Sequence, residues 1–481
     1  MDTRTDGAHS RWRLPPQIKF IIGNEAAERF SFYGMRNILT VFLVDYLLSR
    51  HLASSEREAQ AKSIFHLFVV GVYYFPLLGG MIADRFLGKF RTILWLSLVY
   101  CAGHACLALF EQSPPGFYFG LFLIALGSGG IKPCVSAFVG DQFNEESKAL
   151  AKTVFAAFYW SINFGSFFAS LFIPKALERY GPKIAFGIPG VFMAIATAIF
   201  WLGREHYVEV PPSPKNPHSF IRVLRSALRG RSTRKTGTSF WDAALEHHPP
   251  SAVNGARSVF AILKVFAPIP FFWMLFDQKA SAWVLQAKRM DLDVLGFRFA
   301  PSQLQFINPL LVMMLVPFTA AVLYPAAQRM GYPLTPLRRM TIGMFFAAIS
   351  FVMVAGLEIW IGQGAKPTVL WQLAPYLALT TAEVLVSVTG LEFAYSQAPP
   401  EMKSTIMSFW SLTVAIGNLV VAVVAKLNVF SGAASFLFYA GLVTLAGIAL
   451  GLVARSYVTV DHYRSASPGG PEPYRKPGDA R

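Results

Sequence analysis

The sequence has few charged residues for its length. Charged residues make up 15% of the 481 residues, whereas 54% are hydrophobic. Soluble proteins contain about 25% charged residues. Together with a mean hydropathy of +0.44, this composition indicates a membrane protein and excludes a soluble enzyme.

Cysteine is also scarce. The three cysteines, Cys101, Cys106 and Cys134, all lie in apolar segments, so we interpret them as small buried hydrophobic residues. They provide neither a disulfide framework nor a metal site. The sequence also lacks the Cys/His cluster or HExxH pattern that an enzyme within the membrane would need. We therefore expect no enzymatic activity, no metal and no cofactor.

The first 17 residues are polar, and no small-residue cleavage site precedes the first apolar segment. A secretory signal peptide would contain such a site after a short apolar region. We therefore expect an uncleaved first helix.

Twelve apolar segments are long enough to cross a bilayer, which requires about 20 helical residues. A polar stretch at residues 203–257 separates them into two groups of six. This division predicts an all-α integral membrane protein whose two halves close around a site near the membrane midplane. We expect domains at 1–202 and 258–457, a cytoplasmic linker at 203–257 and a cytoplasmic tail at 458–481. The segments lie near residues 18–48, 61–82, 92–110, 116–139, 152–173, 184–202, 258–287, 302–327, 339–361, 368–396, 404–426 and 432–455.

Lysine and arginine are unevenly distributed between the two sets of loops. If both termini are cytoplasmic, the cytoplasmic segments contain 27 of the 43 Lys and Arg residues and the opposite loops contain 11. Because cytoplasmic loops carry the excess of positive charge, both termini are predicted to be cytoplasmic. The net charge of +16 then reflects loop composition and attraction to anionic lipids, with no nucleic-acid partner. We expect a monomer in the cell (inner or plasma) membrane.

The first apolar segment concentrates charge on one face. At about 100° per residue, four of its charged residues and two aromatic residues, Phe32 and Tyr33, fall within a sector of about 140°. A charge at the bilayer centre costs about 2.5 to 3.5 kcal/mol, so this sector is not expected to face lipid. We expect it to face a polar cavity or partner charges within the protein. The ionisable residues are Glu25, Glu28, Arg29 and Arg36.

A basic, glycine-containing turn lies between the second and third segments. It reads Gly80-x-x-Ala83-Asp84-Arg85-x-x-Gly88-Lys89-x-Arg91. This turn resembles the cytoplasmic motif of the major facilitator superfamily. The resemblance implies the fold of that superfamily, with 12 transmembrane helices in two six-helix bundles.

Residues 24–36 read Asn-Glu-Ala-Ala-Glu-Arg-Phe-Ser-Phe-Tyr-Gly-Met-Arg. This resembles the ExxERFxYYG signature of the proton-dependent oligopeptide transporter family, except that Phe32 occupies the first tyrosine position. The resemblance covers nearly the whole chain, and the absence of an extra central helix pair is similar to the mammalian members. Further matching segments are Gly129–Pro133, Gly140–Phe143, Phe158–Ser166, Phe272–Trp273, Asp277–Gln278 and Gly390–Phe393.

The resemblance implies a symporter that imports di- and tripeptides together with protons by alternating access. A dipeptide is a zwitterion whose ends are about 7 Å apart when extended, so its site needs charges of both signs. Arg29, Arg36 and Lys132 can provide the positive end, and Glu383 the negative end. The resemblance assigns the peptide amine to Glu383 and the carboxylate region to Arg29 and Lys132. It implies that the pocket is lined by Tyr33, Asn163, Asn308 and Trp410.

Proton coupling requires a carboxylate whose ionisation depends on a partner that moves or binds substrate. Arg29 lies four residues after Glu25 and next to Glu28, so it can hold a carboxylate ionised until the substrate carboxylate competes for it. We therefore predict that Glu25, Glu28 and Arg29 couple protons to transport. A purely structural Glu25–Arg29 pair is the alternative. His66 is a further candidate because an isolated histidine titrates near pH 6.5, although a role in packing stays open.

The resemblance pairs Asp277 with Arg36 as a gate across the extracellular opening. This gate would close when Asp277 is ionised and loosen when it is protonated, whereas a fixed pair between the halves is the alternative. Lys279, two residues further on, has no role that follows from the sequence. Glu392 is expected at a helix end or an inner gate.

Two other functions remain open. The same scaffold is compatible with another small solute, such as nitrate or an amino-acid conjugate, and with a peptide sensor that does not transport. Nitrate has no ammonium group, so it would leave Glu383 without a function.

Overall fold

The structure, a computed structural model, describes residues 15–143, 148–212, 216–229, 240–399 and 402–457. Residues 1–14, parts of the predicted linker, and the predicted tail at 458–481 lie outside this description. The described chain is helical apart from one small antiparallel hairpin, β1 (Asp293–Val294) and β2 (Phe297–Arg298).

The helices of the first half end or begin mostly where proline or glycine occurs. Pro76 lacks an N–H group, and its ring clashes with the carbonyl of the residue four positions earlier, so α2 gives way to α3 there. Pro114 and Pro182 occupy first helical positions, where proline is favoured. The helices are α1 (Ile18–Phe42), α2 (Ser54–Tyr74), α3 (Pro76–Ile82), α4 (Lys89–Leu109), α5 (Pro114–Asp141), α6 (Lys148–Tyr180) and α7 (Pro182–Leu202).

The linker contributes α8 (Phe220–Arg229), which packs on the second half through the rings of Phe220 and Phe409, 5.7 Å apart. The second half contains more interrupted helices than the first. They are α9 (Pro250–Phe266), α10 (Ile269–Phe276), α11 (Ala282–Ala287), α12 (Ile307–Phe318), α13 (Tyr324–Arg329), α14 (Pro336–Gly362), α15 (Leu373–Glu383), α16 (Thr389–Gln397), α17 (Lys403–Leu427) and α18 (Gly432–Ser456).

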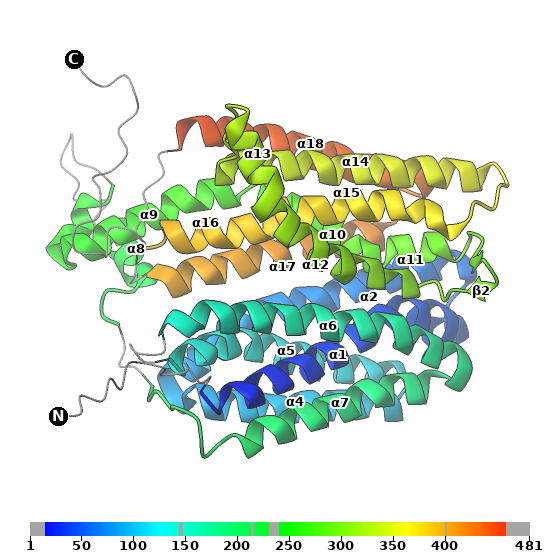
Figure 1. Ribbon diagram of the computed structural model, residues 1–481, viewed down its shortest axis with the longest axis horizontal. Coiled ribbons are helices and arrows are strands. Elements are labelled where there is room, and N and C mark those ends of the chain that lie inside the picture. Colours follow the sequence, from blue (N-terminus) through cyan, green and yellow to red (C-terminus); the bar gives the residue numbers. More distant parts are fainter. Residues whose placement is uncertain (1–14, 144–147, 213–215, 230–239, 400–401, 458–481) are drawn as a thin grey trace, which may run out of the picture.

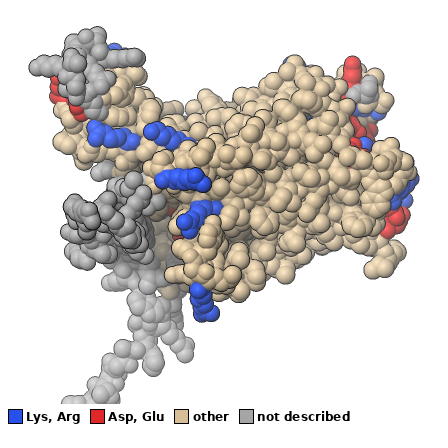
Figure 2. All heavy atoms as spheres, turned by 90° about the horizontal axis from the view of Figure 1, so that it is seen from above, with Lys and Arg blue, Asp and Glu red and all other residues tan. Residues whose placement is uncertain are grey.

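Most of these helices are long and apolar enough to cross a membrane. Among the described residues, ten helical spans are long and apolar enough, and the pair Pro250–Phe266 and Ile269–Ala287, bent by 47°, makes an eleventh. Helix α1 has the position of a twelfth span but carries too many charges to qualify by composition. On the face shown in Figure 2, a broad belt without charged side chains separates Lys, Arg, Asp and Glu at the two ends. These features confirm the all-helical, multi-span membrane fold that the sequence predicts.

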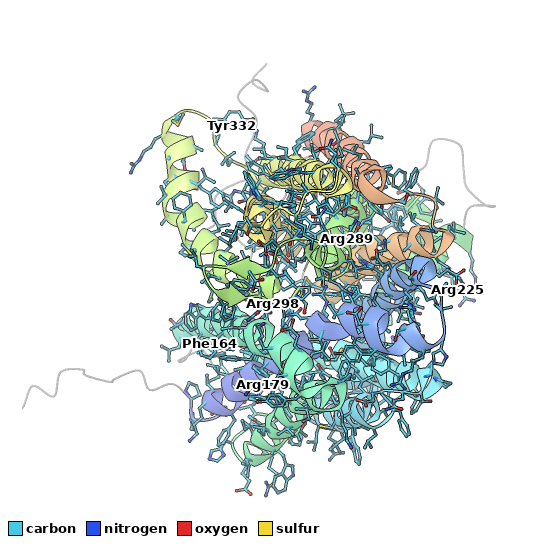
Figure 3. The ribbon with its side chains drawn as sticks, turned by 90° about the vertical axis from the view of Figure 1, so that its right-hand side faces the viewer. Phe164, Arg179, Arg225, Arg289, Arg298 and Tyr332 are labelled. Atoms are coloured by element: carbon cyan, nitrogen blue, oxygen red, sulfur yellow. The ribbon has the colours of Figure 1, made fainter. Side chains whose placement is uncertain are left out.

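The helices form two groups that lie side by side along the long axis (Figure 1). Buried residues between 18 and 207, together with Ala280 and Leu285 of the second half, make one core, and the other buried residues between 220 and 450 make the second core. Seen from the end opposite the termini, the two groups face each other across the molecule (Figure 3). Helix α1 packs against α6 and α7 inside the first group, whereas α2 packs against α17 across the boundary between the groups.

Helix α3 approaches α5 so closely that one glycine is required between them. A Cβ atom on Gly79 would lie 2.2 Å from the carbonyl oxygen of Gly130, whereas the nearest heavy atom to a Cβ on Gly80 is 4.0 Å away. We expect Gly79→Ala to destabilise the protein by about 1 to 3 kcal/mol, because α3 must move away from α5. The melting temperature in detergent measures this effect.

Gly80→Ala is the matched control for that substitution. It lies in the same helix, and alanine is favoured over glycine in helices, so its melting temperature should equal or exceed that of the wild type. Equal melting temperatures for the two variants would show that the close approach of α3 and α5 is not needed for stability.

Candidate functional site

Arg29 lies between two buried carboxylates of its own helix. Its Nε atom is 2.7 Å from Oε1 of Glu25 and 2.8 Å from Oε2 of Glu28. Only the Glu25 contact has hydrogen-bond geometry, and neither oxygen of Glu28 accepts a hydrogen bond within the described part of the chain. The exposed fractions of Glu25 and Glu28 are 2% and 3%, so this charged face of α1 points into the protein and not toward lipid.

The position of this cluster depends on a close contact between α1 and α6. A Cβ atom on Gly165 of α6 would lie 2.6 Å from the carbonyl oxygen of Ala26 and 3.2 Å from the Cβ of Arg29. Glycine therefore permits α6 to cover the turn of α1 that carries Glu25, Glu28 and Arg29.

Lys132 of α5 lies next to this cluster. Its Nζ atom is 4.1 Å from the ring centre of Tyr73 and 4.9 Å from that of Phe32, which are cation–π distances. Lys132 is also close enough to Arg29 and Glu28 to interact with them electrostatically. Phe32 thus keeps an aromatic face toward the ammonium group although it lacks the tyrosine hydroxyl. Tyr33 contacts the Phe32 ring edge-on, with ring centres 5.4 Å apart.

A second group of polar residues joins the two halves. Arg36 of α1 forms an ion pair and hydrogen bond with Oδ1 of Asp277, and Nδ2 of Asn418 donates to Oδ2 of Asp277 at 2.7 Å. The Nδ1 atom of His66 is 2.7 Å from Oδ1 of Asn418, and its Nε2 atom is 2.9 Å from Oγ of Ser281. An amide oxygen only accepts, so Nδ1 of His66 donates to Asn418. Asn418 therefore connects the histidine to the aspartate.

A third group lies entirely in the second half. The ammonium group of Lys279 donates to Oδ1 of Asn308 at 2.9 Å, and Nδ2 of Asn308 donates to Oε2 of Glu383 at 2.7 Å. One amide thus separates a buried cation from a carboxylate. Glu383 is the last residue of α15, directly before a π-helical turn at Val384–Val388, a distortion that is frequent at functional sites.

Two of the predicted site residues, Asn163 and Trp410, lie apart from the three charged groups in the hydrogen-bond network. Nδ2 of Asn163 donates to the carbonyl of Tyr159, one turn earlier in its own helix, at 3.0 Å. Trp410 packs against the rings of Phe266 and Trp273 at 5.3 and 6.3 Å. In the described chain, no hydrogen bond joins Asn163 or Trp410 to the three charged groups. The structure therefore places the predicted residues in three groups. The first contains Glu25, Glu28 and Arg29, the second contains Arg36, His66 and Asp277, and the third contains Asn308 and Glu383.

Sequence reasoning missed three residues of these groups. Lys279 had no expected role, Ser281 was part of a matching segment but had no assigned role, and Asn418 was not predicted. A polar residue in an apolar span is costly unless it has a partner, so the position of Asn418 within α17 was a usable signal. Glu392, in contrast, has a side chain that is 65% exposed and 3.9 Å from Arg339, which matches a contact at a helix end.

Membrane-spanning helices with interacting charges inside and between the two halves of the bundle are typical of multi-pass membrane transporters. Residues 90–433 match the family model PTR2, described as the POT family, and the chain belongs to this family. The POT family consists of transporters and not of enzymes, as the sequence predicts.

Two relatives and one solved structure show how far the similarity extends. "Peptide transporter family 1" of Drosophila melanogaster is 40% identical over 369 residues, which cover 73% of this chain and 48% of the relative. "Solute carrier family 15 member 2" of Homo sapiens is 36% identical over 399 residues, covering 79% and 54%. The crystal structure of an auto inhibited POT family peptide transporter has 47% identity and a TM-score of 0.87, covering 94% of this chain and 99% of that chain. The chain thus spans about half the length of the two named relatives.

Proposed function

We propose that the protein is a proton-coupled symporter that imports di- and tripeptides by alternating access. The observation that carries this proposal is the presence of carboxylates inside the bundle whose cationic partners can be exchanged. Arg29 pairs with Glu25 and Glu28, whereas Glu383 interacts with Lys279 through Asn308. A zwitterion can compete for both arrangements, since its carboxylate attracts arginine and its ammonium group attracts Glu383. Relatives named as peptide transporters support this substrate class.

In this proposal, the two ends of the peptide bind to different halves. Glu383 binds the ammonium group, and Asn308 then turns from Lys279 toward the peptide. Arg29, Arg36 and Lys132 surround the carboxylate. Aromatic side chains such as Tyr33 and Trp410 impose few directional constraints on the peptide side chains, which favours many different peptides. Asn163 is a further proposed lining residue.

Proton coupling follows from the shared arginine. When the peptide carboxylate draws Arg29 away, Glu25 and Glu28 lose their cationic partner, and one of them takes up a proton. His66 is the proposed first acceptor because its contact with Asn418 connects it to Asp277.

The ion pair between Arg36 and Asp277 is the proposed outer gate. Asp277→Asn mimics the protonated form, which cannot pair with Arg36, so we expect uptake in the variant to increase less steeply as the external pH falls. The initial rate of peptide uptake between pH 5 and 8 measures this. If the variant keeps the wild-type pH profile, the pair is fixed and the gate assignment is wrong.

Asp45→Asn is the matched control for the gate. Asp45 also pairs across the two halves, with Nζ of Lys288 2.5 Å from its Oδ1, but its side chain is 37% exposed. Exposed ion pairs contribute about 0 to 1 kcal/mol, so this variant should keep the wild-type pH profile.

We also propose the arrangement in the membrane. The protein is a monomer in the inner or plasma membrane of the cell. Both of its termini lie in the cytoplasm, and the 27 Lys and Arg residues in the cytoplasmic segments support this orientation. The proposed helical domains are 1–202 and 258–457, with a linker at 203–257 and a tail at 458–481. The two hydrophobic cores support the division into two domains. The chain is proposed to lack an extra central helix pair, as in mammalian members, because the described residues between 203 and 249 contain only the short helix α8 and a 3₁₀ turn.

Uptake of labelled dialanine into proteoliposomes tests the function directly. We expect accumulation only when an inward proton gradient is imposed, and about 10- to 100-fold slower uptake in Glu383→Ala. Uptake of nitrate or of an amino-acid conjugate without dialanine uptake would assign another solute. Dialanine binding without uptake of any of these solutes would indicate a sensor.

A further inference from the structure

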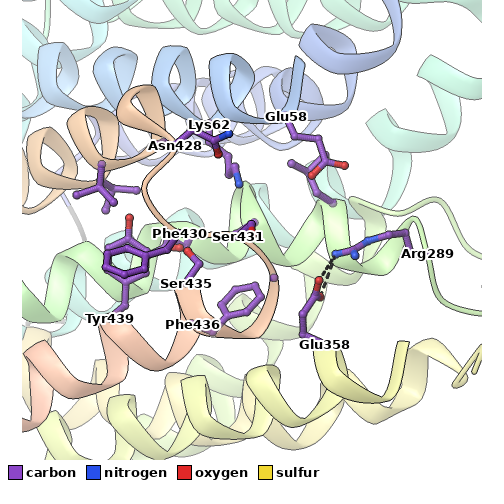
Figure 4. A pocket seen from close by; sticks show the side chains of 17 residues that line it. Glu58, Lys62, Arg289, Glu358, Asn428, Phe430, Ser431, Ser435, Phe436 and Tyr439 are labelled. Atoms are coloured by element: carbon purple, nitrogen blue, oxygen red, sulfur yellow. Dashed lines mark hydrogen bonds and ion pairs between the residues drawn. The ribbon is translucent and has the colours of Figure 1, made fainter. Parts of the chain in front are cut away.

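A polar cavity lies near the end of the bundle opposite the termini (Figure 4). It is formed between α2 of the first half and α11, α14, α17 and α18 of the second half, and its volume is about 180 Å³. Its charged lining residues are Glu58, Lys62, Arg289 and Glu358, none of which belongs to the three groups described above.

Two of these charges are in direct ion-pair contact, whereas Glu58 and Lys62 interact electrostatically without such a contact. Nη2 of Arg289 is 2.8 Å from Oε1 and 2.9 Å from Oε2 of Glu358, and Gln286 also donates to Glu358 at 2.9 Å. Glu58 and Lys62 lie one turn apart on α2 and are both partly buried. Their spacing permits an ion pair, yet within the described part of the chain neither has a hydrogen bond or an ion pair within 4.0 Å. The cavity thus offers one unpaired cation and one unpaired carboxylate.

The cavity is directly adjacent to the group that joins the two halves. Lys62 precedes His66 by one helical turn, and the lining residue Gln278 follows Asp277 in the chain. The lining residue Val421 lies one turn after Asn418 in α17. The cavity therefore adjoins the group that contains Arg36, Asp277, His66 and Asn418.

We infer that this cavity is a second binding site for a small zwitterion, which is held there before the Arg36–Asp277 pair opens. Lys62 binds the carboxylate and Glu58 the ammonium group. Residues one turn apart have Cβ atoms about 5 to 6 Å apart, and both side chains are flexible, so they can reach the charges of a dipeptide about 7 Å apart.

The volume restricts the ligand. Pockets for drug-sized ligands start at about 300 Å³, so a cavity of about 180 Å³ fits a peptide with small side chains, such as dialanine. The assignment of this ligand to a transport path rests on the proposed function, but binding at the cavity can be measured without transport.

Protection of an introduced cysteine tests the site. Ser435 is a small lining residue, and Ser435→Cys combined with Glu383→Ala places a thiol in the cavity of a protein whose central site is impaired. The rate of labelling by a membrane-impermeant maleimide is measured with and without dialanine, and protein with the native cysteines alone provides the background. When the dialanine concentration is ten times its dissociation constant at the cavity, we expect the labelling rate to fall about tenfold, because the fraction of protein with an empty cavity falls by about that factor.

Lys62→Met in the same background should abolish this protection. Lys62→Arg should retain it, and so should Lys426→Met, which removes an exposed lysine of α17 outside the cavity. Absence of protection, or equal protection with and without Lys62, would overturn the inference, even when the wild type transports dialanine. Failure of the wild type to transport dialanine, with protection intact, would instead contradict the proposed function.

Uptake kinetics provide a second test that needs no cysteine. In otherwise wild-type protein, Lys62→Met should raise KM for dialanine about fivefold and leave the maximal rate unchanged, which corresponds to the loss of about 1 kcal/mol for a partly exposed charge pair. Lys62→Arg should restore the wild-type KM. An unchanged KM in Lys62→Met would count against capture at this cavity.

Discussion

Glu383→Ala is expected to reduce dialanine uptake by about 10- to 100-fold. A hydrogen bond to a charged group contributes about 1.5 to 3 kcal/mol, and each 1.4 kcal/mol corresponds to about a tenfold change. In the structure, Asn308 already presents its amide to Glu383, so the carboxylate is held in place for an ammonium group. Initial rates of uptake under an imposed proton gradient, corrected for the amount of protein in the vesicles, measure the effect.

Glu392→Ala is the matched control for this substitution. Glu392 lies nine residues further along the same segment, but its side chain is 65% exposed and only 3.9 Å from Arg339, so it is outside the buried groups. Its uptake should equal that of the wild type. Glu383→Gln should show a similar reduction in uptake, because an amide has no charge to attract the peptide amine. Wild-type uptake in Glu383→Gln would contradict the assignment of the ammonium group to Glu383.

Glu25→Gln is expected to separate proton coupling from peptide binding. Gradient-driven uptake should fall about tenfold or more. A tenfold change corresponds to about 1.4 kcal/mol, and the coupling free energy between two sites is commonly about 1 to 3 kcal/mol. Counterflow, in which internal peptide exchanges for labelled external peptide, needs no net proton movement and should persist. The reason is that Glu25 shares Arg29 with Glu28, so the glutamine removes one ionisable partner and leaves the other.

The two activities must be compared in the same vesicles. Glu205→Gln, whose side chain is 74% exposed next to Arg204, is a control that should change neither activity. If Glu25→Gln keeps both activities at wild-type levels, Glu25 has no coupling role. If both are lost while the protein remains folded, the Glu25–Arg29 pair is structural.

The contacts that the sequence predicted best are those within one helix. The helical period alone places Glu25, Glu28 and Arg29 on one face, and lipid cannot solvate that face, so an inward orientation followed without knowledge of the fold. The structure has these residues buried and paired. The roles of these residues in proton transfer remain predictions.

Contacts between helices were harder to predict from the sequence. The resemblance to a family suggested Arg36 with Asp277, but nothing in the spacing of Lys279, Asn308 and Glu383 indicated that an amide would connect the other two. Likewise, Asn418 lies 352 residues from His66 in the chain. Such pairs depend on the rotation and register of packed helices, which periodicity does not determine.

The sequence by itself determined the class of this protein. Its low charge content, its apolar segments and the charged face of its first helix require a membrane bundle with a polar interior, because hydrocarbon does not solvate charge. Only the tertiary structure decided which charges meet. It placed Asn308 between Lys279 and Glu383, joined His66 to Asp277 through Asn418, and left Glu58 and Lys62 unpaired in a cavity beside that group. These arrangements arise where separate helices pack together, so they depend on distances between helices that no single segment encodes.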